Sequence, residues 1–289
     1  MTLNSPSTPQ RVSAYDDASF AGGPAPAPKP AAHLSSERQR QVTRLCAMTG
    51  ITLLQHSAES ALVESLTRRL GLALGVDRVE VALMANAITV TTIVDGECIT
   101  TVRRNEDRGV NMHMVMEVQR AALAVEAGRM NADQYQRAIE GIAPLKYARW
   151  ATVVAIGLSC ACFARLAGAD WAGCGLAFAA SALAMVTRHV FTHYHFSPMI
   201  GFLAAGFVAT SITAQGFIYQ LGNTPKLAMA ASVLLLVPGF PLINGVSDIV
   251  KGYANTGISR LVIALLLSGM SCIGIMLGML VWGARGWLS

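Results

Sequence analysis

The chain has 289 residues, of which 53% are hydrophobic and only 13% are charged. A soluble globular domain carries about 25% charged residues, so this composition excludes a wholly soluble protein. The net charge of +5 is too modest to indicate a nucleic-acid-binding protein, and the six cysteines lack the CxxC spacing of a zinc site. Most of the charge lies before Trp150, which predicts a water-soluble N-terminal part followed by a membrane part.

The N-terminal part is expected to consist of a tail and a small domain. Residues 1–34 are rich in alanine, proline and serine and have no apolar core, so we predict a disordered tail and no signal peptide. Residues 35–145 mix helical and strand patterns, which predicts a cytoplasmic α+β domain. The expected elements are two helices between Ser35 and Gly75, strands at 78–84, 88–94 and 97–104, and helices at 111–128 and 131–141. Asp95-Gly96 suits a two-residue turn between the second and third strands.

Residues 146–289 predict a transmembrane domain, because five segments are apolar enough to cross a bilayer as helices. These segments are residues 149–167, 171–187, 198–219, 226–247 and 259–283. Tryptophan and tyrosine near their ends match an aromatic belt. With the N-terminus inside, six flanking lysines and arginines fall on the cytoplasmic side and three outside, which favours this orientation. We therefore expect a membrane α-helical bundle of about five transmembrane helices, embedded in the lipid bilayer.

The fourth segment carries the strongest functional signal. It contains Pro238-Gly239-Phe240-Pro241, and proline removes a backbone donor and clashes with the preceding turn, so the helix should break here. Backbone groups that are freed at membrane depth must face protein or a water-filled cavity. Because transporters build substrate and ion sites from broken helices of this kind, we predict a transporter.

Polar residues follow the break at helical spacing. Asn244, Asp248 and Lys251 lie three, seven and ten residues after Pro241, which places all four on one face of a helix. A half-helix starting near Pro241 would direct its amide dipoles at an anion, such as an amino-acid carboxylate. Asp248 would then take an ammonium group or a proton. The alternative is a solvated helix end with an Asp248–Lys251 ion pair.

Two patterns in other spans concern helix packing. Gln215 follows Thr210, Ser211 and Thr213 in the third span, where such side chains either bind a polar solute or, more often, hydrogen-bond to neighbouring helices. Gly274 and Gly278 form a GxxxG motif in the fifth span, which predicts close helix packing and an oligomer.

Two further patterns were considered for metal binding and catalysis. His189 and His193, with His195 nearby, have a spacing that a metal ion could use, but no carboxylate accompanies them and the segment is interpreted as an interfacial loop. His56, Ser57 and Glu59 are near neighbours in HSAES, which does not by itself assemble a catalytic triad. We therefore predict no metal, no cofactor and no enzymatic activity.

Three segments resemble the bacterial threonine/serine exporter family, in particular its short version, in which a five-span subunit works with a separate smaller membrane subunit. They are Gly50-Ile51-Thr52-Leu53-Leu54 with Ala58-Glu59-Ser60, Leu74-Gly75-Val76, and VPGFPLINGVSDIVKGYANTGISRL from Val237. The likeness covers residues 36–283, although Ser57 stands where the family usually has glycine. The resemblance carries over to the signature positions Pro238, Gly239, Asn244, Asp248, Gly252, Gly257 and Arg260.

This resemblance implies a secondary exporter subunit of the inner membrane that moves threonine and serine and is coupled to protons. Two alternatives stay open, a subunit of a dicarboxylate (succinate) exporter and an accessory subunit of a partner that forms the transport path. The second module of fused family members does not follow, which implies a second small membrane subunit. Lys251 and Arg260 would attract anions at the inner mouth. The candidate substrate- or ion-binding residues are Pro238, Gly239, Pro241, Asn244, Asp248, Lys251, Arg260 and Gln215.

Overall fold

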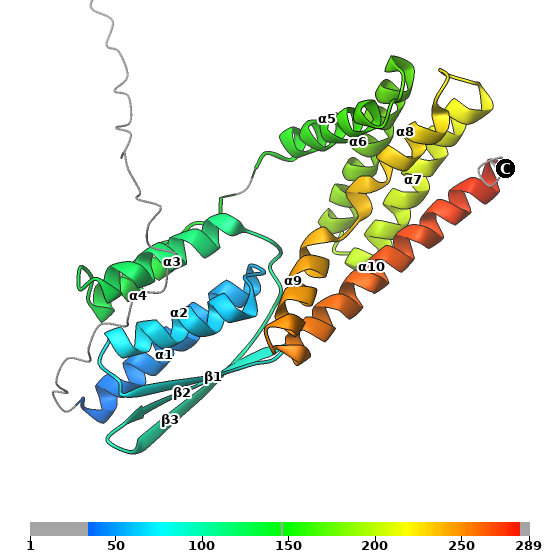
Figure 1. The fold of residues 1–289 in the computed structure, drawn as a ribbon. Helices are drawn as coiled ribbons and strands as arrows, with labels where there is room; N and C mark the ends of the chain where they lie inside the picture. The colour runs from blue at the N-terminus through cyan, green and yellow to red at the C-terminus, as the bar shows by residue number, and fades with distance from the viewer. Residues whose placement is uncertain (1–33, 146, 284–289) are drawn as a thin grey trace, which may run out of the picture. The chain divides into compact units, whose positions relative to one another are not determined.

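The N-terminal region folds as helices stacked on one face of a small sheet (Figure 1). The computed structural model describes residues 34–145 and 147–283, and the first of these ranges contains four helices and three strands. They are α1 (Ser36–Gln55), α2 (Ser60–Ala73), β1 (Arg78–Leu83), β2 (Ala87–Val94), β3 (Glu97–Arg104), α3 (Met112–Glu126) and α4 (Ala132–Glu140). The tail predicted at residues 1–34 lies outside the described residues except for Leu34. The boundary predicted at 145/146 stays a prediction.

The sheet is antiparallel with strand order β1-β2-β3, and alternation along β2 buries Ile88, Val90 and Val94. The predicted hairpin is confirmed, because Val94 pairs with Glu97 across a turn in which Asp95 and Gly96 both have positive φ (50° and 82°). Helices α1 and α2 pack against the sheet, and α3 packs against both helices, which leaves three layers (Figure 1). The apolar core lies between these layers.

The second half contains the helices that are long and apolar enough to cross a membrane (Figure 1). Within the described residues four single helices qualify, or five spans if a bent pair counts as one. The four are α5 (Arg149–Leu166), α6 (Trp171–His193), α7 (Pro198–Ile218) and α10 (Ala254–Val281). The bent pair joins α8 (Pro225–Ser232) and a short 3-10 turn (Leu234–Leu236) to α9 (Gly239–Val250) at an angle of 59°. The predicted break in the fourth span is therefore confirmed.

Helix α6 corrects one expectation. The second span was predicted to end at residue 187, with the histidines in a loop, but the helix continues to His193. Arg188, the first residue beyond the predicted end, lies with its guanidinium carbon 4.3 Å from the centre of the Phe202 ring. The charge is thus accommodated on the side of a continuing helix, where a cation interacts favourably with an aromatic face.

Close packing at glycines joins α10 to α7 and to α9. A Cβ at Gly274 of α10 would lie 2.1 Å from the carbonyl oxygen of Leu203 in α7, so the GxxxG motif packs against a helix of the same chain. A Cβ at Gly257 of α10 would lie 2.7 Å from the carbonyl oxygen of Gly245 in α9. The second half of the broken span is therefore held tightly along the first turns of α10.

Candidate functional site

The break in the fourth span lies at Val237 and Pro238. Val237 is extended (φ −74°, ψ 119°) and Pro238 occupies the N-cap position, so α9 begins at Gly239, two residues before the predicted start at Pro241. Pro241 is the third residue of the helix, where its missing N–H would have had no intrahelical partner. Proline thus fits inside the first turn, and the half-helix starts near Pro241 as predicted.

The turn between α1 and α2, residues 56–59, is the partner of this half-helix. Ser57 has a φ of 64°, in the left-handed region, and Glu59 precedes α2 without making a side-chain cap hydrogen bond. The cap comes instead from α9. Asp248 accepts from the backbone N–H of Ser60 at 3.0 Å and from the Ser60 hydroxyl at 2.8 Å. A carboxylate at the N-terminus of α2 also interacts favourably with the helix dipole.

Asp248 is fully buried and has a second partner in Arg260 of α10. Arg260 Nη1 lies 3.0 Å from Asp248 Oδ2, and its Nη2 donates to the carbonyl of Ala58 at 2.7 Å. The Nη1 atom makes an ion pair but no hydrogen bond among the described residues, so it retains a free donor. Since a buried charge is stable only when it is paired and hydrogen-bonded, Asp248 and Arg260 depend on each other.

Further polar side chains from α9 and its C-terminal end bind the same turn. Asn244 donates its amide N–H to the carbonyl of Ser57 at 2.9 Å. Lys251 and Ser247 both donate to the carboxylate of Glu59, and these bonds lower the pKa of Glu59. The Asp248–Lys251 pair of the alternative interpretation is replaced by this Lys251–Glu59 pair.

Tyr253, in the short link between α9 and α10, adds a further contact with α2. Its hydroxyl donates to the carboxylate of Glu64 at 2.6 Å. Burial and this hydrogen bond raise the pKa of Tyr253 to about 12. The tyrosine therefore stays neutral and remains a donor at every physiological pH.

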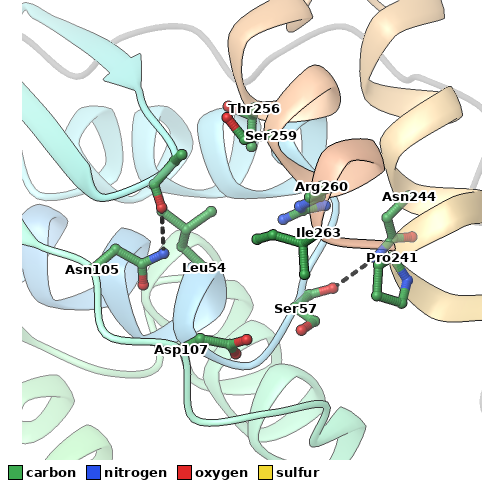
Figure 2. Close-up of a pocket in the computed structure, with 11 residues that line it drawn as sticks. Leu54, Ser57, Asn105, Asp107, Pro241, Asn244, Thr256, Ser259, Arg260 and Ile263 are labelled. Carbon is green, nitrogen blue, oxygen red and sulfur yellow. Dashed lines mark hydrogen bonds between the residues drawn. The ribbon is translucent and has the colours of Figure 1, made fainter. Parts of the chain in front are cut away.

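A cavity of about 120 Å³ opens beside these contacts (Figure 2). Its lining comes from the N-terminal region and from α9 and α10: Leu54, Ser57, Ala85, Asn105, Asp107, Pro241, Asn244, Thr256, Ser259, Arg260 and Ile263. Among the described residues, three of these carry buried polar atoms without a hydrogen-bond partner, namely Asn105 Oδ1, Thr256 Oγ1 and Arg260 Nη1. Buried polar groups are normally paired, so these atoms are available to a small polar solute.

The cavity has the chemistry to recognise a carboxylate. Arg260 supplies a cation with unused donor capacity, and Thr256 supplies a hydroxyl. Asp107, which is exposed, supplies a negative charge on the same lining. A guanidinium binds carboxylates in a planar, directional geometry, and a nearby carboxylate suits an ammonium group.

The predicted binding residues thus lie close together in one region, except for Gln215. Pro241, Asn244 and Arg260 line the cavity. Asp248 does not line it but forms an ion pair with Arg260, and Lys251 forms an ion pair with Glu59. Pro238 lies at the break, and Gly239 is the first residue of α9. Gln215 lies on α7, which contributes no residue to the described lining of the cavity; its Nε2 is buried and unpartnered.

Four residues of the site were not predicted: Ser60, Asn105, Asp107 and Thr256. Ser60 lies in the HSAES segment, which entered the sequence analysis as a possible triad and as part of the family resemblance, but not as a ligand of Asp248. Thr256 lies in the segment from Val237 that resembles the exporter family, but it was not singled out there. Asn105 and Asp107 have no local signal, because their proximity to the site depends on contacts between distant parts of the chain.

Comparison with known proteins gives a consistent picture. A model of the family ThrE, described as "Putative threonine/serine exporter", matches residues 44–282. The chain is 48% identical over 258 residues to the "Probable succinate transporter subunit YjjP" of Escherichia coli K12, covering 88% of this chain and all of that protein. It is 51% identical over 252 residues to the protein of the same description from Klebsiella aerogenes, covering 86% and 97%.

A more distant relative carries the name of the family. The "Probable threonine/serine exporter" of Mycobacterium tuberculosis is 28% identical over 206 residues, which is 66% of this chain and 38% of that protein. No solved structure matches the chain.

Proposed function

The chain belongs to the ThrE family of threonine/serine exporters, and from this premise we propose that it is one subunit of a secondary exporter for small carboxylate-bearing metabolites. Succinate is the first candidate, because two relatives that match nearly full-length are described as succinate transporter subunits. The observation that supports a carboxylate substrate is the buried guanidinium of Arg260, with an unused donor, on the lining of a small polar cavity.

Threonine or serine is the second candidate. The description of the family names these amino acids, and the cavity lining combines a guanidinium with the carboxylate of Asp107. A zwitterion needs both charges, whereas succinate would be repelled by Asp107 unless one carboxyl is protonated or Asp107 turns to solvent. The choice between the two substrates therefore depends on Asp107.

The contacts of Arg260 suggest how export would be coupled to protons. Asp248 and a substrate carboxylate compete for the same guanidinium. A proton on Asp248 removes its ion pair with Arg260 and leaves the guanidinium free for the substrate. When Asp248 loses the proton, it recovers Arg260 and displaces the substrate. A proton and a substrate are then bound together and released together at one site, so this scheme predicts that the two cross the membrane in the same direction.

The α1–α2 turn would act as the inner gate in this scheme. Ser60 and Ala58 bind the same two side chains, Asp248 and Arg260, whose pairing would change during the cycle. Loss of the Asp248 charge weakens the cap on α2, and the broken span at Pro238 provides a joint about which α9 can move. The role is therefore transport and gating, without catalysis.

A second membrane subunit is part of this proposal. Both close relatives are described as subunits. Helix α9 exposes Phe240, Ile243 and Val246 along one face, and Val250 is 80% exposed at its end. Such a face needs lipid or another membrane helix, and we place the partner there. The assembly would lie in the inner membrane with the N-terminus in the cytoplasm.

Transport by reconstituted protein tests the proposal. Proteoliposomes with the full-length chain, alone and with a co-expressed small membrane subunit, are given labelled succinate, threonine or serine under an imposed proton gradient. We expect gradient-dependent succinate flux from the two-subunit preparation. Flux of threonine or serine alone would select the second candidate. If neither preparation moves any of the three, although the protein is correctly inserted, the exporter proposal is wrong.

Asp248→Asn separates coupling from insertion. This variant keeps the shape of the side chain but cannot lose a proton, so gradient-dependent flux should disappear while substrate exchange without a gradient persists. Asp133→Asn is the matched control, because it makes the same chemical change on the exposed surface of α4. Normal coupled export by Asp248→Asn would remove this residue from the mechanism.

A further inference from the structure

A separate group of basic side chains lies where α5 begins and α6 ends. Two cavities, of about 380 and 220 Å³, share Arg149, His189 and His193 in their linings. His189 and His193 are one turn apart on the last part of α6, which continues past the predicted end of the span. His195 adds a third imidazole to the smaller cavity. The side chains come from two antiparallel neighbouring helices and converge at one end of them.

The charges of this group suit an anion. Among the described residues that line the two cavities there is no aspartate or glutamate. Arg149 is the first residue of α5, and Ala148 before it makes no side-chain cap hydrogen bond, so the arginine lies at the positive end of the helix dipole. A cation is unfavourable for the helix itself at this positive end, whereas a bound anion satisfies the helix terminus and the arginine together.

A metal ion does not explain the histidines. Within residues 34–145 and 147–283, no group of three or more histidine, cysteine or acidic side chains is arranged to hold one. Neutral imidazole donates one N–H and charged imidazole donates two, so both forms can bind an anionic oxygen.

The larger cavity also has an apolar wall. This wall is formed by Val153 of α5 and by Val186 and Val190 of α6, which line the cavity together with the basic group. Trp150 and Tyr194 line the same cavity and are 73% and 69% exposed, as aromatic side chains are at the headgroup level of a bilayer. A free phosphate ion makes no use of an apolar wall. A phospholipid does, because its acyl chain continues from its phosphate along the helices.

We propose that the cavities between α5 and α6 bind an anionic phospholipid of the type of phosphatidylglycerol. Arg149 pairs with the phosphate, His189 and His193 donate imidazole N–H groups to its oxygens, and one acyl chain lies along Val153 and Val190. Basic pockets between membrane helices on the cytoplasmic side are suited to anionic headgroups. The bound lipid would link the start of α5 to the end of α6. This proposal does not depend on the transported substrate.

Native mass spectrometry of the purified full-length chain tests the lipid site. The protein in detergent is titrated with dioleoyl-phosphatidylglycerol, with dioleoyl-phosphatidylcholine and with inorganic phosphate. We expect retained adducts with phosphatidylglycerol at lower concentration than with phosphatidylcholine. Arg149→Gln should weaken phosphatidylglycerol binding about fivefold, the effect of removing one basic side chain near a lipid surface. His193→Gln, at an exposed position, should weaken it to a smaller extent.

Arg165→Gln is the matched control. Arg165 lies near the other end of α5, also beside a tryptophan, with its guanidinium carbon 4.9 Å from the centre of the Trp171 ring. Equal loss of binding in Arg165→Gln and Arg149→Gln would overturn the site, as would equal affinity for the two lipids. If inorganic phosphate displaces the lipid at millimolar concentration, the site is one for a soluble anion and the lipid assignment is wrong. His193→Gln provides the decisive comparison if Arg149→Gln does not purify as a monodisperse protein.

Discussion

Asp248 shows how one carboxylate can join three parts of the molecule. It accepts two hydrogen bonds from Ser60, forms an ion pair with Arg260, and belongs to the half-helix that follows the break. Asp248 is fully buried, so the loss of either partner would leave a charge or a polar group without compensation and would cost more than breaking a surface contact. At the scale of single residues, the site is therefore a structural connection as well as a candidate for proton transfer.

Arg260→Gln should destabilise the protein strongly, because it leaves the buried carboxylate of Asp248 without its cation. Removing one partner of a buried pair costs about 3–5 kcal/mol. The thermal unfolding midpoint in detergent, followed by size exclusion, measures the effect. Lys251→Gln is the control, since the partly exposed Lys251–Glu59 pair is worth at most about 1 kcal/mol. Adding Asp248→Asn to Arg260→Gln should recover part of the loss. Equal midpoints for the two single variants would contradict this account.

Ser57→Gly should stabilise the protein. Ser57 has a φ of 64°, and the left-handed conformation costs a residue with a side chain roughly 1–2 kcal/mol. Glycine removes that strain but gains freedom in the unfolded chain, so the net gain should be about 0.5–1 kcal/mol. The same midpoint measurement detects it. Ser65→Gly, on the exposed surface of α2, should instead destabilise, and a gain at both positions would argue against backbone strain as the cause.

At the scale of elements, the broken span divides into two halves with different environments. Helix α8 packs among α5, α6 and α7, whereas α9 packs along the start of α10. Helix α10 approaches α9 closely at Gly257 and α7 closely at Gly274. Helix α10 is therefore the element that connects the half-helix of the site with the rest of the membrane bundle.

Gly274→Ala should disrupt this connection. The added methyl would lie 2.1 Å from the carbonyl oxygen of Leu203, and a backbone atom cannot move aside without shifting the helix. Overpacking of this kind costs about 1–3 kcal/mol, so the unfolding midpoint and the yield of folded protein should both fall. Gly269→Ala, in the same helix with nothing within 4 Å of the added atom, should leave both unchanged. A similar loss in both variants would mean that helix propensity or expression, and not packing, is responsible.

At the scale of the whole molecule, the α1–α2 turn and the start of α2 carry the polar contacts described here between the N-terminal region and the membrane helices. Residues 57–60 contact Asn244, Asp248 and Arg260, and Glu59 and Glu64 contact Lys251 and Tyr253. A change at the break is therefore transmitted first to α2. The orientation of the chain in the membrane decides on which side this coupling takes place.

The native cysteines provide a test of that orientation. Cys98 is exposed on β3, whereas Cys162 and Cys272 are exposed on apolar spans, where a water-soluble reagent cannot reach a thiolate. Burial raises the pKa of the Cys46 thiol to about 12, so this residue should not react either. A membrane-impermeant maleimide should therefore label inside-out vesicles and not intact spheroplasts. Cys98→Ser should abolish the labelling. Labelling of spheroplasts at Cys98 would place the N-terminal region outside.

The sequence by itself determined the local elements of this protein and its family. Hydrophobic periodicity predicted the helices of the N-terminal region, Asp95-Gly96 predicted the hairpin, and Pro238 predicted the break. These signals act within a few residues, through backbone stereochemistry and the hydrophobicity of one segment, so they can be read without a structure. The predicted end of the second span at residue 187 was wrong because a local pattern carries no information about other helices. The aromatic ring that accommodates Arg188 belongs to Phe202 of α7.

Only the tertiary structure decided which side chains meet. Ser60 lies 188 positions before Asp248 in the chain, and nothing in the local pattern of either segment indicates the other. The alternative interpretation paired Lys251 with Asp248 on the same helix, but Lys251 pairs with Glu59, and the partners of Asp248 are Ser60 at the start of α2 and Arg260 of α10. Asn105 and Thr256 reach the same cavity from a loop after β3 and from α10. Such contacts depend on how elements pack across long sequence distances, and local propensities carry no information about that packing.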